Sequence, residues 1–234
     1  MCVHLVSHTG VDFLFQDVDI TWFKDPREYF HDEKQKDHTF DIYFQDDGAR
    51  SLRYAPYSAN SGFYYVRNND RTQYFLTQLM LSGDLILKTY SHQQALVAVL
   101  TEHSSLFGLR VKVFGKEDDA WPGGFHYHQK GDNSYFRRYF DNKTAVDPYV
   151  FHMSWTFNKD NKLLFLKQLG EWYVHDKCID KKLEDIELKD VSFLENCCSS
   201  EALFSCHFRD KPSKEPCHDS PAIDNGKASF WKVK

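Results

Sequence analysis

The residues best suited to chemistry lie near the start of the chain, where two aspartates follow an apolar run. Residues 11–15 predict a buried strand, and Asp17 and Asp19 come after it, two positions apart. Side chains at the carboxyl end of a strand can turn into the crevice where open α/β sheets bind ligands. Two carboxylates there would hold Mg²⁺ or Mn²⁺, ions that often complete their coordination with substrate phosphates. An Asp-x-Asp pair also arises by chance among 34 acidic residues, but the aromatic residues behind it, Trp22 and Phe23, favour the metal site.

Several later polar residues each have a simple structural explanation. An Asn or Gly can merely form a turn, a Gln can lie in an exposed first helical turn, a His can sit in the core, and a Lys can be solvated. Asp47, on a loop near the crevice, is a candidate substrate contact, and Trp155 is a candidate stacking platform for a sugar ring. The simple structural explanations apply to Asn60, Gly62, Gln93, Gln94, His152, Lys159 and Lys162.

The elements that must position these residues alternate between strands and helices. Strands are predicted at residues 40–44, with alternating apolar and polar positions, and at 63–66, 109–114 and 146–151. Helices are predicted at residues 72–81, 91–102 and 158–172, a loop at 121–124, and a charged surface segment at 27–38. Strands that alternate with helices predict an α/β sheet.

The composition bounds the class of protein. A chain of 234 residues, of which 41% are hydrophobic, is one large domain or one domain with an appendage. Aromatic residues make up 16%, and in clefts such rings stack on sugars or bases. The net charge of −5 gives no sign of nucleic-acid binding, and no apolar run reaches transmembrane length.

The cysteines are concentrated in the last quarter of the chain. Because no Cys-x-x-Cys pair occurs, a zinc ribbon is not expected. Disulfides formed in an oxidising compartment fit the cluster better than reduced thiols, and five clustered cysteines would leave one over. A glycosylation sequon at residues 142–144 agrees with a secretory location. The pairing of the clustered cysteines stays open; they are Cys178, Cys197, Cys198, Cys206 and Cys217.

Taken in order, these motifs resemble the nucleotide-diphospho-sugar transferase family, which consists of retaining glycosyltransferases with the GT-A fold. In that family an apolar strand ends in Asp-x-Asp, followed by a Trp and an Asx-Pro pair; here Asp17, Asp19, Trp22 and residues 25–26 match. An Asn-x-Gly strand, an Asp-Gln pair, a Pro-Gly loop and a late His followed by Lys come next. The resemblance implies a GT-A-like mixed sheet flanked by helices over residues 1–174. The composition shifts after that point, and the charged residues, prolines and cysteines of residues 175–234 predict a Cys-rich extension that is held by disulfides or partly disordered.

The resemblance also implies roles for individual residues. Asp17, Asp19 and His152 would hold Mn²⁺ or Mg²⁺, and the diphosphate of a UDP-sugar would lie near Asp17, neutralised by Lys159 or Lys162. The catalytic contacts near the anomeric carbon would come from Asn60, Gln93 and Gln94, with Gly62 beside the substrate. The implied activity is transfer of a sugar, with retention of configuration, to a glycan or glycoprotein acceptor in the Golgi lumen.

Two departures from the family pattern stand out. Gln93 and Gln94 replace the Asp-Gln pair, which removes a charged acceptor for sugar hydroxyls and implies a different donor sugar or weakened activity. The Asp-x-Asp motif begins at residue 17, whereas the family carries about half a sheet before it. We therefore expect a truncated domain that lacks much of the nucleotide-binding half, exposes an unpaired sheet edge, and reaches a membrane only through an upstream anchor.

Two other functions remain open from the sequence. Residues 15–21 also resemble the Asp-x-Asp-x-Thr motif of haloacid-dehalogenase-type phosphatases, in which Asp17 would be a covalent nucleophile and Asp19 its acid/base, with residues 118–119 binding magnesium. A catalytically inactive glycan-binding domain would instead explain Gln93 and the missing front half. The His126-x-His128 pair has no third ligand nearby in the sequence, so we expect it on the surface.

Overall fold

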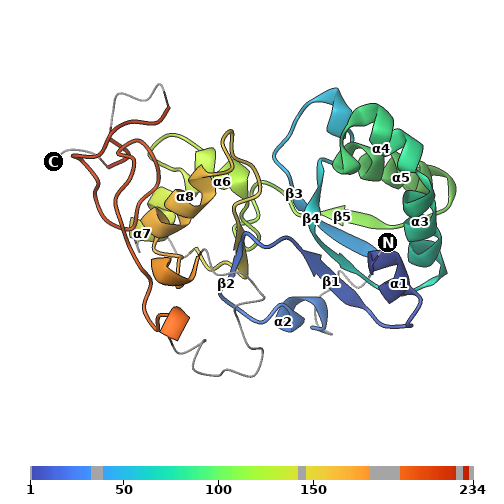
Figure 1. Cartoon of the computed structure of the whole chain (residues 1–234). Helices are drawn as coiled ribbons and strands as arrows, with labels where there is room; N and C mark the ends of the chain where they lie inside the picture. Colours follow the sequence, from blue (N-terminus) through green and yellow to red (C-terminus); the bar gives the residue numbers. More distant parts are fainter. Residues whose placement is uncertain (1, 33–38, 142–145, 180–195, 225–228, 232–234) are drawn as a thin grey trace. The chain divides into compact units, whose positions relative to one another are not determined.

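The computed structural model describes the chain except for residues 1, 33–38, 142–145, 180–195, 225–228 and 232–234. The sequon therefore lies outside the described residues. The chain forms two compact units (Figure 1): the first comprises Met1–Gln129 and Ala145–Trp155, and the second Lys130–Thr144 and Thr156–Lys234. This division differs from the sequence domains expected to meet at residue 174, which stay a prediction.

The first unit is built on a mixed four-stranded sheet with the order β1-β4-β3-β5 (Figure 1). Strand β4 (Ala59–Val66) pairs antiparallel with β1 (Phe13–Gln16) on one side and with β3 (Ile42–Asp46) on the other. Strand β5 (Val111–Val113) runs parallel to β3. Within the described residues β1 is an edge strand, because it pairs only with β4. A separate two-stranded sheet joins β2 (Ile20–Trp22) to β6 (Val150–His152), antiparallel.

Side chains on both faces of the four-stranded sheet are buried. One face packs against helices α3 (Asp70–Leu81) and α5 (His92–Leu106), while the other forms a mainly aromatic cluster. The strand predicted at residues 40–44 is confirmed as β3, shifted by two residues, and every position of β3 is buried, as expected for a strand covered on both faces. Smaller helices are α1 (Cys2–Ser7), α4 (Gly83–Thr89) and α6 (Gly124–His128).

One residue of the expected charged surface segment contributes to the core. Helix α2 (Arg27–Phe30) places Phe30, which is 2% exposed, against the aromatic face of the sheet. The Phe30 ring stacks on Tyr65 with 4.1 Å between ring centroids. The charged residues Arg27 and Glu28 are exposed, as the surface prediction for residues 27–38 requires, but the prediction is wrong for Phe30, which anchors the helix. Residues 33–38 of that segment lie outside the described residues.

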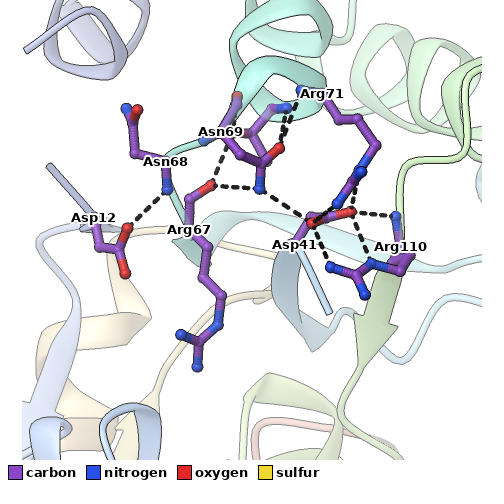
Figure 2. A network of polar contacts seen from close by, with 8 residues as sticks. Asp12, Asp41, Arg67, Asn68, Asn69, Arg71 and Arg110 are labelled. Atoms are coloured by element: carbon purple, nitrogen blue, oxygen red, sulfur yellow. Dashed lines mark hydrogen bonds and ion pairs between the residues drawn. The ribbon is translucent and has the colours of Figure 1, made fainter. Parts of the chain in front are cut away.

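A buried carboxylate ties the start of β3 to α3 and β5 (Figure 2). Asp41 accepts hydrogen bonds from Arg71 (2.7 Å), Arg110 (3.0 Å) and the Asn69 amide (3.1 Å). Asn69 also caps α3, since its side chain accepts from the backbone N–H groups of Arg71 and Thr72. Burial opposes ionisation of Asp41, but the hydrogen bonds from the two arginines outweigh it and hold the pKa of Asp41 well below its usual range.

The second unit contains helices α7 (Tyr135–Asp141) and α8 (Asn161–Leu169) and two disulfides, Cys178–Cys197 and Cys206–Cys217. Cys198 is left over, as expected for five clustered cysteines. Helix α8 is shorter than the predicted 158–172, because Gly170 at φ +75° closes it with a left-handed cap. Among the described residues, no helix combines the length and apolar character needed to cross a membrane.

Candidate metal centre

The two aspartates lie on the connection between the two sheets of the first unit. Strand β1 ends at Gln16 and β2 begins at Ile20, so Asp17 and Asp19 occupy a link of three residues. The backbone N–H of Asp17 donates to Gly62 O (2.7 Å), and the carbonyl of Asp19 accepts from Met153 N (3.0 Å). The link is therefore held between β4 and the segment that follows β6.

His152 faces this link from β6. It pairs with Ile20 across the small sheet and is 1% exposed. Its Nε2 atom lies 3.3 Å from Asp19 Oδ1 and 4.0 Å from Asp17 Oδ2. One ligand atom from each of the three residues lies within 4.8 Å of the other two. The structure thus brings together two aspartates and a histidine more than 130 positions apart in the sequence.

A buried glutamine fixes which nitrogen of His152 carries the proton. The Gln45 side-chain nitrogen donates to the carbonyls of Trp121 (3.0 Å) and Pro122 (2.8 Å), so its oxygen must face His152. That oxygen lies 2.8 Å from His152 Nδ1 and can only accept, which places the imidazole proton on Nδ1. In the neutral ring Nε2 then presents a lone pair toward the carboxylates.

The Nε2 atom of His152 is buried and makes no hydrogen bond within the described part of the chain. Such a polar atom is costly unless something else satisfies it. The two nearest acceptors, on Asp17 and Asp19, cannot donate to it when ionised. A cation bound between the three groups would satisfy the lone pair and both carboxylates, so the set fits a divalent metal.

Gly62 leaves the space that the Asp17 carboxylate occupies. A Cβ added at Gly62 would lie 2.2 Å from Asp17 Oδ2 and 3.0 Å from Asn60 Oδ1. The Gly62 N–H donates to Asn60 Oδ1 (2.6 Å). Gly62 is therefore required beside the aspartate by close approach rather than by a turn, since it lies inside β4.

A second polar group lies where β3, β4 and α5 meet. Asn60 is 4% exposed and donates to Asp47 Oδ1 (2.8 Å). Gln93 hydrogen-bonds Asp47 as well, and its Oε1 accepts from the Ser61 hydroxyl (3.3 Å). Burial raises the pKa of Asp47, and the hydrogen bonds from Gln93 and Asn60 oppose this rise. The Asp47 carboxylate thus connects Asn60 and Gln93, so that three of the predicted site residues lie together.

The remaining predicted residues are placed as follows. Gln94 lies in the first turn of α5, where its backbone N–H donates to the Ser91 side chain that caps the helix. Trp155, 56% exposed, packs edge-on to His128. Lys159 and Lys162 belong to the second unit, so their expected contacts with the diphosphate stay predictions.

The His126-x-His128 pair is not the surface pair that we expected. His126 is 4% exposed; its Nδ1 accepts from Gly123 N (3.1 Å), and its Nε2 lies 2.8 Å from Lys116 O. This histidine holds the loop at residues 121–124, which in turn presents the carbonyls that orient Gln45. The surface prediction is wrong for His126 because sequence spacing cannot show which backbone groups a ring will meet.

Gln45 is the site residue that the sequence reasoning missed. It is completely buried in β3, and its partners lie more than 70 positions downstream. One signal was present in the sequence: Gln45, an uncharged polar residue, follows the apolar strand residues and comes directly before Asp46 and Asp47. A polar side chain inside a buried strand needs partners, and so indicates a polar neighbour on the adjacent elements.

The site does not match the phosphatase interpretation. Within the described residues, the cluster able to hold a metal contains Asp17, Asp19 and His152, whereas that interpretation needs Asp118 and Asp119 beside Asp17. Asp118 instead accepts a hydrogen bond from the backbone N–H of Ala120 (3.0 Å).

Comparison with known proteins agrees with the transferase motifs. The family model for nucleotide-diphospho-sugar transferases matches residues 2–166. The chain is also similar to UDP-galactose:fucoside alpha-3-galactosyltransferase of Dictyostelium discoideum, with 21% identity over 194 residues, covering 75% of this chain. The chain spans only 27% of that relative's length. No solved structure matches the chain significantly. Since the family model covers well over half of its residues, the chain belongs to the nucleotide-diphospho-sugar transferase family.

Proposed function

We propose that this chain carries the donor-sugar and metal site of a retaining glycosyltransferase. In this proposal a sugar moves from a UDP-sugar to a glycan or glycoprotein acceptor, with Mn²⁺ or Mg²⁺ as the required ion. Family membership supports a nucleotide-sugar donor. The observation that carries the metal requirement is the buried Nε2 atom of His152, which faces two carboxylates and has no hydrogen-bond partner within the described residues.

The three side chains suit the proposed ion. Carboxylate oxygens favour Mg²⁺ and Mn²⁺, and the added imidazole is a more usual ligand for a transition metal, which favours Mn²⁺. Gln45 provides the hydrogen bond to the far nitrogen that metal-binding histidines normally have. When bound, the ion would supply Lewis-acid stabilisation of the departing diphosphate. Lys159 or Lys162 would add a mobile positive charge to the same diphosphate.

The residues around Asp47 are suited to hold the donor sugar. Asn60 and Gln93 are proposed to contact hydroxyls near the anomeric carbon, together with Gln94. The family's Asp-Gln pair is Gln-Gln here, so the usual carboxylate is missing from the helix. Asp47, directly after the end of β3, lies beside Gln93 and would supply a carboxylate in its place. Retention through an oxocarbenium-like ion pair needs no strong protein nucleophile, and the leaving phosphate can act as the base.

Donor and compartment can be proposed more specifically. The relative in Dictyostelium is named for a UDP-galactose donor and a fucoside acceptor, so these are the first substrates to test. Two disulfides in the second unit support an oxidising compartment, and we place the protein in the lumen of the secretory pathway, in the Golgi. Trp155, half-exposed at the end of the first unit, is proposed to stack on a sugar ring.

The test is release of UDP from UDP-galactose with and without a fucoside, measured against Mn²⁺ concentration. The change Asp19→Asn keeps the shape of the side chain and removes its charge, so both Mn²⁺ affinity and UDP release should fall. Asp84→Asn, on an exposed helix position, is the matched control and should change neither. Retained Mn²⁺ binding and turnover in Asp19→Asn would refute the proposal.

A further inference from the structure

The second unit contains a polar cavity of about 480 Å³ that is not part of the metal centre. Its size is in the range of small-molecule sites. The lining residues combine aromatic rings with carboxylates, hydroxyls and one ammonium group. The residues that carry these groups are Tyr139, Phe140, Glu171, Tyr173, Glu201 and Lys214.

The walls of the cavity are fixed by the end of α8 and by the two disulfide-linked segments. The backbone N–H of Ser199 donates to Tyr173 O (2.7 Å), and that of Lys214 donates to Gln168 O (2.9 Å). Ser199 follows the Cys178–Cys197 disulfide, and Lys214 lies inside the Cys206–Cys217 loop. The walls are therefore pre-organised, which lowers the entropy cost of binding a ligand.

Glu171 provides the main polar group of the cavity. Its Oε1 accepts a hydrogen bond from the Tyr139 hydroxyl (3.2 Å), and this is its one side-chain hydrogen bond within the described residues. Burial raises the pKa of Glu171 to about 7, opposed by Tyr139 and by the charge of Lys214. Tyr173 and Glu201 are the other titratable groups that line the cavity. The second carboxylate oxygen, Oε2, thus keeps its capacity to accept from a ligand.

The aromatic lining supplies the apolar half of the site. Tyr139 and Phe140 meet edge-to-face, with 5.3 Å between ring centroids, and Tyr173 is 41% exposed beside them. Gly170 also matters, because a Cβ at this position would lie 2.5 Å from Lys214 Cδ. The missing side chain lets Lys214 lie across the end of α8 and reach the cavity.

We propose that this cavity binds a neutral sugar residue of the glycan acceptor. A sugar ring presents C–H groups that pack on aromatic faces and hydroxyls that donate to carboxylates. The lining holds two carboxylates, Glu171 and Glu201, and one ammonium group, Lys214, so its negative charge disfavours acidic sugars and phosphates. The identity of the ligand as an acceptor rests on the proposed transferase function, whereas sugar binding by the cavity does not.

The proposal is tested by saturation-transfer NMR on the whole chain at pH 8, where the Glu171 carboxylate is ionised, with EDTA and without any nucleotide sugar. The probes are methyl glycosides of galactose, glucose, mannose, fucose, arabinose and xylose, with a methyl glucuronide as the acidic comparison. At least one neutral glycoside should bind, and Glu171→Gln and Tyr173→Ala should each weaken it about tenfold, the loss expected for one charge-assisted hydrogen bond or one ring contact. Glu171→Gln preserves shape, so it tests binding even if Tyr173→Ala impairs folding.

Two controls separate this cavity from the rest of the protein. Tyr74→Ala removes a ring of matched exposure, 42%, in the first unit and should leave binding unchanged. Asp19→Asn removes a proposed metal ligand and should also leave it unchanged, so failure of the transferase proposal does not affect the result. The proposal is overturned if no neutral glycoside binds, if the glucuronide binds better, or if Glu171→Gln binds as well as the original chain.

Discussion

Replacing Gly62 by alanine should disable the metal centre while leaving the fold intact. The added Cβ would lie 2.2 Å from Asp17 Oδ2, whereas ordinary contact begins at 3.4 Å, so the carboxylate oxygen must move away by about 1.2 Å. Because the Asp17 side chain is 54% exposed, it can swing into solvent without disturbing the core. The backbone of Gly62 has no positive φ and lies within β4, so alanine itself is tolerated there.

The expected loss follows from this displacement. Losing a hydrogen-bond partner of a metal ligand typically costs about 10- to 100-fold in metal affinity, so displacing the Asp17 ligand itself should cost about 100-fold, or about 2.7 kcal/mol of Mn²⁺ binding. The unfolding free energy should fall by about 1 kcal/mol or less, because the Asp17 side chain is half-exposed and Asn60 Oδ1, 3.0 Å from the added Cβ, needs to shift only slightly. Calorimetric Mn²⁺ titration and urea unfolding measure the two quantities separately.

Gly83→Ala is the matched control, because a Cβ at Gly83 meets nothing within 4 Å. It should leave Mn²⁺ affinity unchanged and keep or slightly raise stability. If Gly62→Ala binds Mn²⁺ within about threefold of the original chain and is equally stable, Asp17 does not ligate the ion and the argument from close approach is wrong.

Three further changes test other parts of the structure. Gln45→Leu should weaken Mn²⁺ binding about 10- to 100-fold by calorimetry, because His152 loses the acceptor that fixes its proton. Asp41→Asn should lower the unfolding free energy, measured in urea at pH 7, by about 2 kcal/mol; this figure is kept small because both partner arginines are half-exposed. Since the pKa of Asp41 is lowered on folding, the difference in stability between the two proteins should narrow as the pH falls below 3.8. Glu171→Gln should stabilise the chain by about 2–3 kcal/mol above pH 7, and not at all below pH 4.5.

The sign of the Glu171 effect follows from its raised pKa. Between pH 4.5 and about 7 the folded chain holds a proton on this carboxyl that the unfolded chain has lost, so its stability falls as the pH rises. Glutamine does not titrate, and the gap between the two proteins should therefore grow through this window. A constant gap from pH 4 to pH 8 would contradict the burial of Glu171.

For the other two changes the contradicting results are also definite. Unchanged Mn²⁺ affinity in Gln45→Leu would mean that the orientation of His152 does not depend on Gln45. A loss of stability in Asp41→Asn that stays the same from pH 7 to pH 2.5 would mean that the lowered pKa of Asp41 contributes nothing to folding. Asp84→Asn, an exposed ion-pair member, serves as the control for both the charge change and the pH range.

The strands and long helices were predictable because hydrophobic period and turn residues are local in the sequence. The helices at 72–81 and 91–102 appear in the structure, the second of them ending four residues later than predicted. The strand at 63–66 also appears, but β4 begins at Ala59, through residues that the sequence indicates as a turn. The end of α8 was predicted too late although Gly170 marked it, because the apolar residue Trp172 recurs at helical spacing three positions after Leu169. Local pattern thus identified the elements, while their ends depended on single residues.

The ordered motifs also predicted which residues meet at the metal centre. Asp17, Asp19 and His152 come together because β2 and β6 pair, a contact that follows from the family resemblance and not from spacing. Gln45 could not be assigned from the sequence, since its role depends on two carbonyls of a distant loop. The same holds for Glu171, whose burial depends on segments fixed by two disulfides.

Pulsed electron paramagnetic resonance of Mn²⁺ bound to the chain tests the metal centre most directly. If His152 Nε2 ligates the ion, electron spin echo modulation should show coupling to one ¹⁴N nucleus, and this coupling should disappear in His152→Gln. Mn²⁺ that binds without nitrogen coupling, or with coupling that survives His152→Gln, would contradict a site built from this histidine and the two aspartates.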